Sequence, residues 1–253
     1  PSQQKTLKKF IYIVLISMVA CSAPKSDQEV FSESQRQEAE AITAPTLYAV
    51  SELEQRLIDQ GLVDLQEYIP GIRVELKYST TDNFFGQDVY GELDRAYLQP
   101  EVADQLKKAQ ELLQAENPDY TLLVYDGVRP LSVQQILWDN LDKPDSIKPL
   151  YVADPKVGSL HNFGVAVDLT IYDTKADSAL DMGTGYDYFG YPAYPDREKQ
   201  MLAEKKITPN QVANREILRK VMNAAGFKGI GSEWWHFNAY TRKEAGEKFE
   251  IVQ

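Results

Sequence analysis

The stretch Ser159–Tyr172, SLHNFGVAVDLTIY, carries the clearest structural and chemical signals in this chain of 253 residues. From Gly164 onward it reads as a strand of apolar residues that is interrupted by Asp168. A carboxylate in such a setting is costly unless it is paired or binds a metal. His161 precedes it by seven residues, and imidazole nitrogen and carboxylate oxygen are both ligands of Zn²⁺. The alternative is that Asp168 faces solvent on an edge strand and that His161 is an ordinary loop residue.

The segment Gly231–Phe237, GSEWWHF, supplies the only other histidine of the sequence. Two Trp and a Phe surround Glu233 and His236, which indicates a water-poor environment where a glutamate with a raised pKa can work as a general acid and base. The alternative is an aromatic core segment with a satisfied histidine. With His161 and Asp168, His236 makes three protein ligands, and three ligands leave the fourth zinc position open for water, as in catalytic sites.

Two other segments contain candidate functional residues. Arg129 follows the strand candidate Tyr120–Tyr125 and could stabilise an oxyanion, or it could simply pair with Asp126 or a surface acid. Asp187 lies between two tyrosines in a glycine-rich loop. It could bind a cationic group or form an Asx-type turn. The residues by themselves leave both choices open.

Together these segments resemble the VanX-type D-alanyl-D-alanine dipeptidases, zinc peptidases that share a fold with D,D-carboxypeptidases and the hedgehog signalling domain. The S-x-H-x-x-G-x-A-x-D pattern at 159–168 and the E-x-W-H pattern at 233–236 are shared with the wider superfamily. The M-G-x-x-[FY]-D-[FY] loop at 182–188 and the segment Leu76–Gly91 resemble the dipeptidase branch. The resemblance spans Ile72–Phe237 in consistent order.

The resemblance implies an α+β fold of the hedgehog/DD-peptidase type, with a mostly antiparallel sheet flanked by helices. It implies that one Zn²⁺ per chain is held by His161, Asp168 and His236. The other implied roles are Glu233 as general base and acid, Arg129 as stabiliser of the tetrahedral intermediate, and Asp187 and Ser159 as substrate-binding residues. The implied reaction is hydrolysis of the D-Ala-D-Ala dipeptide to two D-Ala. The alternatives are a D,D-carboxypeptidase or peptidoglycan endopeptidase of the same superfamily, or a non-catalytic lipoprotein.

The beginning of the chain indicates export. Three lysines precede the apolar run Phe10–Ala20, which is shorter than the roughly 20 residues of a transmembrane helix. Cys21 follows at once, so residues 1–20 resemble a bacterial lipoprotein signal; the alternative is a plain secretory peptide with an incidental cysteine. We expect a lipidated Cys21 and disordered tether over 21–46 and a catalytic domain over 47–253. The expected location is a bacterial envelope, on the periplasmic side, with membrane contact only through the lipid. This leader favours a role in cell-wall dipeptide turnover.

The composition excludes several other classes. The chain has 27 Lys and Arg against 38 Asp and Glu, and a net charge of −11 argues against a nucleic-acid partner. A single cysteine excludes an intramolecular disulfide and a cysteine-built zinc finger. Apolar periodicity predicts helices over 51–65, 99–116, 131–140, 209–225 and 241–249, and strands over 72–78, 120–125, 164–172 and 234–239. Regular βαβ alternation is absent from this order, which supports the α+β class.

Overall fold

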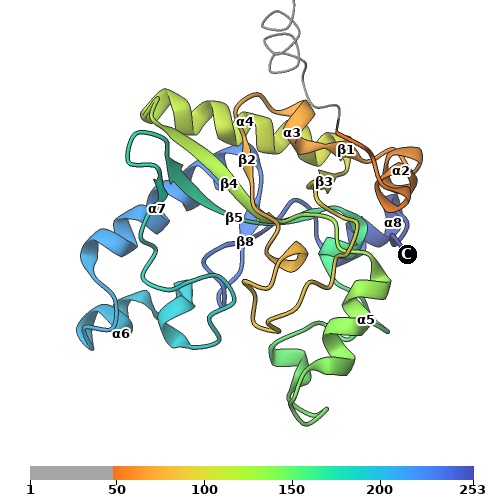
Figure 1. The fold of residues 1–253 in the computed structure, drawn as a ribbon. Coiled ribbons are helices and arrows are strands. Elements are labelled where there is room, and N and C mark those ends of the chain that lie inside the picture. The colour runs from red at the N-terminus through yellow and green to blue at the C-terminus, as the bar shows by residue number, and fades with distance from the viewer. Residues whose placement is uncertain (1–47) are drawn as a thin grey trace, which may run out of the picture. The chain divides into compact units, whose positions relative to one another are not determined.

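The computed structural model describes residues 48–253, and residues 49–253 form one compact unit. The predicted signal, Cys21 and tether lie outside the described residues. The unit is built on a six-stranded sheet with the order β2–β4–β5–β8–β7, and β6 pairs with β5 (Figure 1). Only the β2–β4 pair is parallel in this sheet of the described chain. The predicted α+β fold with a mostly antiparallel sheet is confirmed.

The sheet is accompanied by seven helices in the described part of the chain. They are α2 (Glu52–Asp59), α3 (Leu65–Tyr68), α4 (Pro100–Glu116), α5 (Leu131–Asn140), α6 (Glu198–Ala203), α7 (Pro209–Ala225) and α8 (Arg242–Lys248). The strands are β1 (Val63–Asp64), β2 (Arg73–Val74), β3 (Tyr97–Leu98), β4 (Tyr120–Asp126), β5 (Ala166–Asp173), β6 (Ser178–Ala179), β7 (Lys228–Gly229) and β8 (His236–Asn238). Strands β1 and β3 form a separate pair. Between residues 48 and 253, no helix is both long and apolar enough to span a bilayer.

The helix predicted over 51–65 is wrong beyond Asp59. Helix α2 ends there, and Gly61 adopts a left-handed φ of 87° that most residues avoid. The amide of Leu62 then donates a hydrogen bond to the carbonyl of Leu57, which closes the helix end. The remaining apolar residues belong to β1 and α3 instead.

The strand predicted over 72–78 is also much shorter than expected. Strand β2 covers two residues, and the chain then forms a short 3-10 helix, Lys77–Ser79. Leu76 and Tyr78 are nevertheless buried, so the alternating pattern reflects burial rather than continued strand pairing. The carbonyl of Tyr78 accepts hydrogen bonds from the amides of Val89 and Tyr90, which folds the following loop back on itself.

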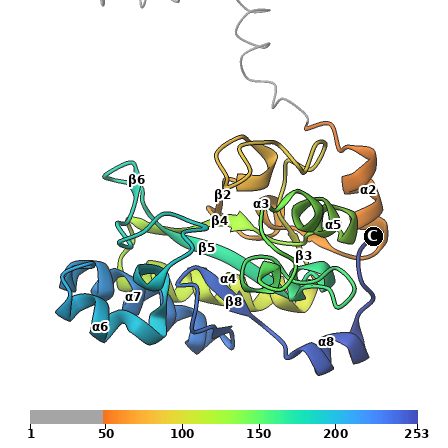
Figure 2. The ribbon, with the colours of Figure 1, turned by 90° about the horizontal axis from the view of Figure 1, so that it is seen from below.

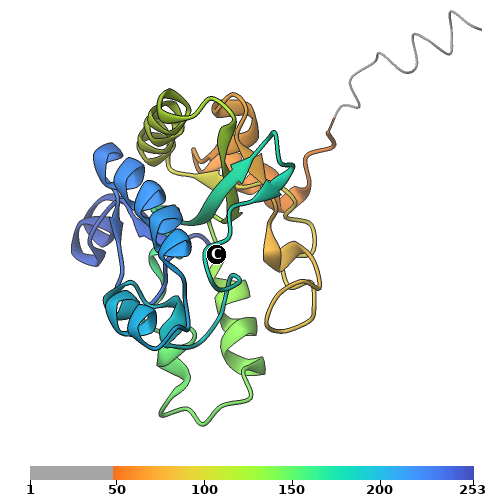
Figure 3. The same cartoon turned by 90° about the vertical axis from the view of Figure 1, so that its left-hand side faces the viewer.

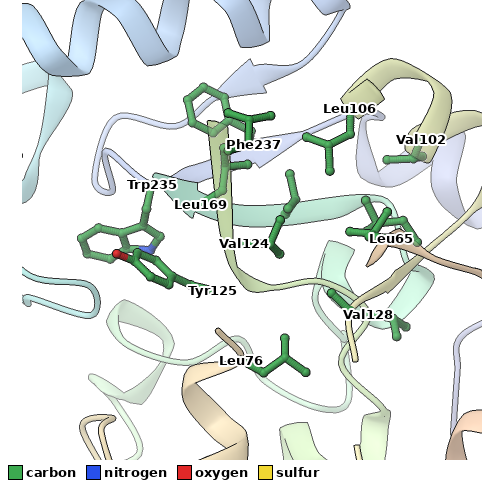
Figure 4. Packing of buried hydrophobic residues seen from close by; sticks show 14 of the residues in the cluster. Leu65, Leu76, Val102, Leu106, Val124, Tyr125, Val128, Leu169, Trp235 and Phe237 are labelled. Carbon is green, nitrogen blue, oxygen red and sulfur yellow. The ribbon is translucent and has the colours of Figure 1, made fainter. Parts of the chain in front are cut away.

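The two faces of the sheet have different roles. Val167 of β5 pairs with Phe237 of β8, and cross-strand partners point to the same face. With Leu169, they form an apolar cluster that includes Leu106 of α4 (Figure 4). Helices α4 and α7 lie side by side against the sheet (Figure 3).

The opposite face carries the polar residues. Asp126 of β4 pairs with Asp168 of β5, which in turn pairs with His236 of β8, so three polar residues form a row across the middle of the sheet. Helix α5 and the loops lie on the side away from α4 (Figure 2). The site therefore lies on one face of the sheet, and the helix-packed apolar core lies on the other.

Candidate active site

The three predicted metal ligands converge on one point. His161 lies in a short 3-10 helix, Leu160–Phe163, and Asp168 and His236 lie in β5 and β8. His161 Nε2 is 3.2 Å from His236 Nδ1 and 3.4 Å from Asp168 Oδ1, and the last two atoms are 2.9 Å apart. Ligand atoms of a tetrahedral zinc ion at about 2.0–2.1 Å lie about 3.3 Å from one another. The donor types and their spacing therefore fit Zn²⁺.

Each imidazole is oriented by a bond from its other nitrogen. His161 Nδ1 donates to the carbonyl oxygen of Gly127 at 2.8 Å, because a carbonyl can only accept. His236 Nε2 donates to Asn238 Oδ1 at 2.8 Å. These bonds make His161 Nε2 and His236 Nδ1 the nitrogen atoms that face the metal position and can offer a lone pair to an ion.

Asp168 does not face solvent on an edge strand, so that alternative is wrong. It is 3% exposed, and β5 lies between β4 and β8. Its second oxygen accepts a hydrogen bond from the Tyr186 hydroxyl at 2.9 Å. Although burial acts to raise it, the neighbouring His161 and His236 hold the pKa of the Asp168 carboxyl well below its usual value. The carboxylate therefore stays charged beside the metal position.

A capped turn places His161. Ser159 Oγ accepts from the His161 amide at 3.3 Å, and Asn162 Oδ1 accepts from the Ser159 amide at 2.5 Å. Asn162 Nδ2 then donates to the carbonyl of Arg129 at 2.7 Å, which ties the turn to the segment after β4. Gly164 ends the turn with a φ of 67°, as its place in the sequence predicts. Ser159 thus has a structural role, and its contact with substrate stays a prediction.

A single cavity of about 490 Å³ contains all the predicted site residues. Those in its lining are Arg129, Ser159, His161, Asp168, Asp187, Glu233 and His236. Glu233 Oε2 is 3.8 Å from His236 Nδ1, and the Glu233 side chain is 30% exposed. Burial raises the pKa of Glu233 above its usual value, which suits a group that takes up and releases a proton.

Arg129 pairs with Asp126, as one interpretation of its sequence position predicts, and its role as an oxyanion stabiliser stays a prediction. It lines the cavity, and it also pairs with the fully buried Asp126. Its Nη2 and Nε lie 2.5 and 3.1 Å from Asp126 Oδ2, and its Nη1 donates to Gln134 Oε1 at 3.1 Å. The Tyr90 hydroxyl also donates to Asp126. The guanidinium is therefore held by Asp126 and Gln134, with Tyr90 supporting Asp126, while it lines the cavity.

Asp187 lies in the same cavity, in a left-handed backbone conformation with a φ of 55°. Its Oδ2 accepts a hydrogen bond from the Tyr78 hydroxyl at 2.9 Å. Burial raises the pKa of Asp187 well above its usual value. A cationic partner that entered the cavity would offset this cost, so the site suits an ammonium group.

Several site residues were not identified from the sequence. These are Tyr78, Tyr90, Tyr186 and Asn238, which support the predicted residues rather than replace them. Three of them lie in segments that carry the family resemblance, and Asn238 lies two residues after His236. Their position beside the predicted residues in the sequence was the one feature that could have indicated a role in the site.

The chain is similar to characterised peptidases over most of its length. A family model described as D-ala-D-ala dipeptidase matches residues 58–250. A D-alanyl-D-alanine dipeptidase of Escherichia coli (strain K12) is 36% identical over 176 residues, 70% of this chain and 83% of that protein. One of Enterococcus faecium is 32% identical over 194 residues, 70% of this chain and 90% of that protein.

Among solved structures, the LD-carboxypeptidase LdcB overlaps with 74% of this chain and 71% of its own, at a TM-score of 0.42 and 18% identity. The sequence matches run from α2 past α8 and include the ligand triad and Glu233. On the strength of these sequence matches, the chain belongs to the D-ala-D-ala dipeptidase family of M15 zinc metallopeptidases.

Proposed function

We propose that this protein hydrolyses the D-Ala-D-Ala dipeptide to two molecules of D-Ala with the help of one bound zinc ion. The observation that carries the proposal is that one cavity contains the ligand triad together with a base, a guanidinium and the half-buried carboxylate of Asp187. Membership of the family and relatives named D-alanyl-D-alanine dipeptidase support the choice of substrate.

In this proposal His161, Asp168 and His236 would hold the ion, and its positive charge would supply acidification of a water molecule and polarisation of the peptide carbonyl. Glu233 accepts the proton that the water loses as its oxygen bonds to the carbonyl carbon. Arg129 stabilises the negative charge that develops on the carbonyl oxygen. When the C–N bond breaks, Glu233 donates its proton to the leaving nitrogen, which departs as the amine of the second D-Ala.

Asp187 is the basis for selecting a dipeptide. The free ammonium of the substrate offsets the cost of keeping this half-buried carboxylate charged. A longer peptide stem would present a neutral amide at the same place and leave the carboxylate unpaired. This difference discriminates against extended chains.

A panel of peptides tests the proposal. The purified protein would be assayed with D,D-, L,D- and L,L-alanyl dipeptides and with a pentapeptide stem ending in D-Ala-D-Ala, with and without a chelator. We expect D-Ala release from the D,D-dipeptide alone, loss of activity on chelation, and recovery with Zn²⁺. Cleavage of the pentapeptide at a comparable rate would contradict the proposal and support a D,D-carboxypeptidase or endopeptidase.

We also propose that the protein is exported and anchored by a lipid on Cys21. The support is the lysine-rich start, the apolar run Phe10–Ala20 and the placement of the sole cysteine directly after it. In that location the enzyme would degrade dipeptide released during cell-wall turnover. Radioactive palmitate should label the wild-type chain but not Cys21→Ala. Equal labelling of the two chains, or none of either, would overturn the lipid anchor.

A further inference from the structure

Three aromatic side chains meet at the end of the cavity that holds Asp187. The ring of Phe189 lies 5.1 Å from that of Phe84 at 90° and 4.9 Å from that of Tyr151 at 76°. These are edge-to-face contacts, the favourable arrangement for aromatic pairs. Phe189 and Tyr151 both line the cavity. We call Phe84, Tyr151 and Phe189 the aromatic wall.

Asp187 lines the same cavity as Tyr151 and Phe189 of the wall. Phe189 follows Asp187 by two residues in the same loop. On the other side, the Tyr78 hydroxyl donates to Asp187, and the Tyr78 ring lies 6.2 Å from that of Phe84. A substrate whose ammonium reaches Asp187 therefore has the wall next to its nitrogen.

The segments behind the wall are firmly held. In the segment Leu76–Gly91, Asn83 Nδ2 donates to three backbone carbonyls at 2.7, 2.8 and 3.0 Å, and Asn83 Oδ1 accepts from the Phe85 amide at 2.9 Å. Before Tyr151, Lys148 Nζ donates to the carbonyl of Trp138 in α5 at 2.9 Å. Side-chain hydrogen bonds thus tie the segments that carry Phe84 and Tyr151, and these two rings support Phe189, which is itself 38% exposed.

Building on the proposed dipeptidase function, we propose that the aromatic wall determines specificity by occupying the space that any substituent on the substrate's amino nitrogen would need. The enzyme then has two separate filters. Asp187 selects for charge on the nitrogen, and the wall selects for a nitrogen that carries no bulky group. A charged but substituted amine should satisfy the first filter and fail the second.

N-isobutyl-D-Ala-D-Ala separates the two filters, because its secondary amine stays protonated at neutral pH. We expect wild-type protein to cleave D-Ala-D-Ala and to cleave the N-isobutyl compound poorly. In Phe189→Ala, the kcat/KM of the N-isobutyl compound relative to D-Ala-D-Ala should rise about tenfold or more, within the range that apolar pockets discriminate. Tyr151→Ala removes the ring that packs against Phe189 and should raise the same ratio of kcat/KM values.

Tyr188→Ala is the matched control, since this neighbouring aromatic residue is 47% exposed and is not in the cavity lining. Its substrate ratio should equal that of wild type. An unchanged ratio in both Phe189→Ala and Tyr151→Ala would overturn the inference, and so would wild-type protein that cleaves both compounds equally well. Wild-type protein that cleaves neither compound would instead overturn the proposed function, and this inference with it.

Discussion

Glu233 lies beside the ligand triad but is not a member of it. Its Oε2 is 3.8 Å from His236 Nδ1, whereas the three ligand atoms lie 2.9–3.4 Å from one another. We therefore expect Glu233→Gln to retain zinc and lose the proton transfer. Its kcat should fall by about two to four orders of magnitude.

The measurement is kcat for D-Ala-D-Ala together with zinc content by elemental analysis. Glu111→Gln, an exposed substitution on α4, controls for the change of charge. A Glu233→Gln protein that holds zinc and is as active as wild type would show that another group moves the proton.

Asn238 affects the metal through His236. Its Oδ1 accepts from His236 Nε2, so Asn238→Ala removes the bond that fixes the ring and its tautomer. Loss of such a partner costs about 10- to 100-fold in metal affinity. Competition with a fluorescent chelator should show weaker zinc binding, while activity at saturating zinc falls less. Asn210→Ala, an exposed position in α7, should bind zinc as wild type does, and equal affinity in both variants would contradict the assigned role.

The sequence was sufficient to identify the residues that can do chemistry, because a buried carboxylate and two rare histidines stand out by type. All seven residues predicted for the site line one cavity. The supporting residues were harder to predict, since a tyrosine or asparagine is common in loops. The sequence indicated Asp126 only as a possible partner of Arg129, and its place opposite Asp168 follows from the strand register.

At the scale of elements, Arg215 of α7 binds the segment that carries Asp187 at two points. Arg215 is 1% exposed, and its Nε and Nη2 donate to the carbonyls of Met182 and Pro192 at 2.7 and 2.8 Å. The two acceptor residues, Met182 and Pro192, precede and follow Asp187 in the chain. Arg215 is therefore a positioning residue for the proposed ammonium site.

We predict that Arg215→Lys raises KM for D-Ala-D-Ala about tenfold with little change in kcat. Lysine keeps the positive charge, but its single ammonium group cannot replace the two guanidinium nitrogens that donate to the carbonyls of Met182 and Pro192. Arg219→Lys is the control, since Arg219 binds Glu198 and neither of these carbonyls in the described structure. Steady-state kinetics and thermal unfolding should be measured together. A change in kcat alone, or equal effects in both variants, would contradict the positioning role.

Elements with strong local signals were predicted well. Helices α5 and α7 have the predicted bounds, because proline begins or precedes each helix and Gly226 ends α7. The segment Leu76–Gly91 could not be predicted in this way. Its structure depends on the hydrogen bonds of Asn83 and on aromatic contacts with Phe189, which bring together residues far apart in the sequence.

At the scale of the whole catalytic unit, the ligand triad joins a turn and two strands, so bound zinc should stabilise the folded state. A ligand present at about 100 to 1,000 times its Kd adds about 3–4 kcal/mol. For a unit of this size, chelation should lower Tm by about 5–15 °C, and added Zn²⁺ should restore it. Differential scanning calorimetry tests this, with Asp168→Asn as the variant whose Tm should no longer respond to zinc. An unchanged Tm after proven loss of zinc would contradict the predicted stabilisation by the metal.

The row across β4, β5 and β8 also determines when the site can exist. His161 and Asp168 are synthesised before His236, which follows Asp168 by 68 residues and reaches the site only when β8 pairs with β5. A nascent chain that has not yet produced β8 therefore holds only two of the three ligands. The hydrolase is silent until β8 has been made and has docked, because only then does the last ligand complete the triad.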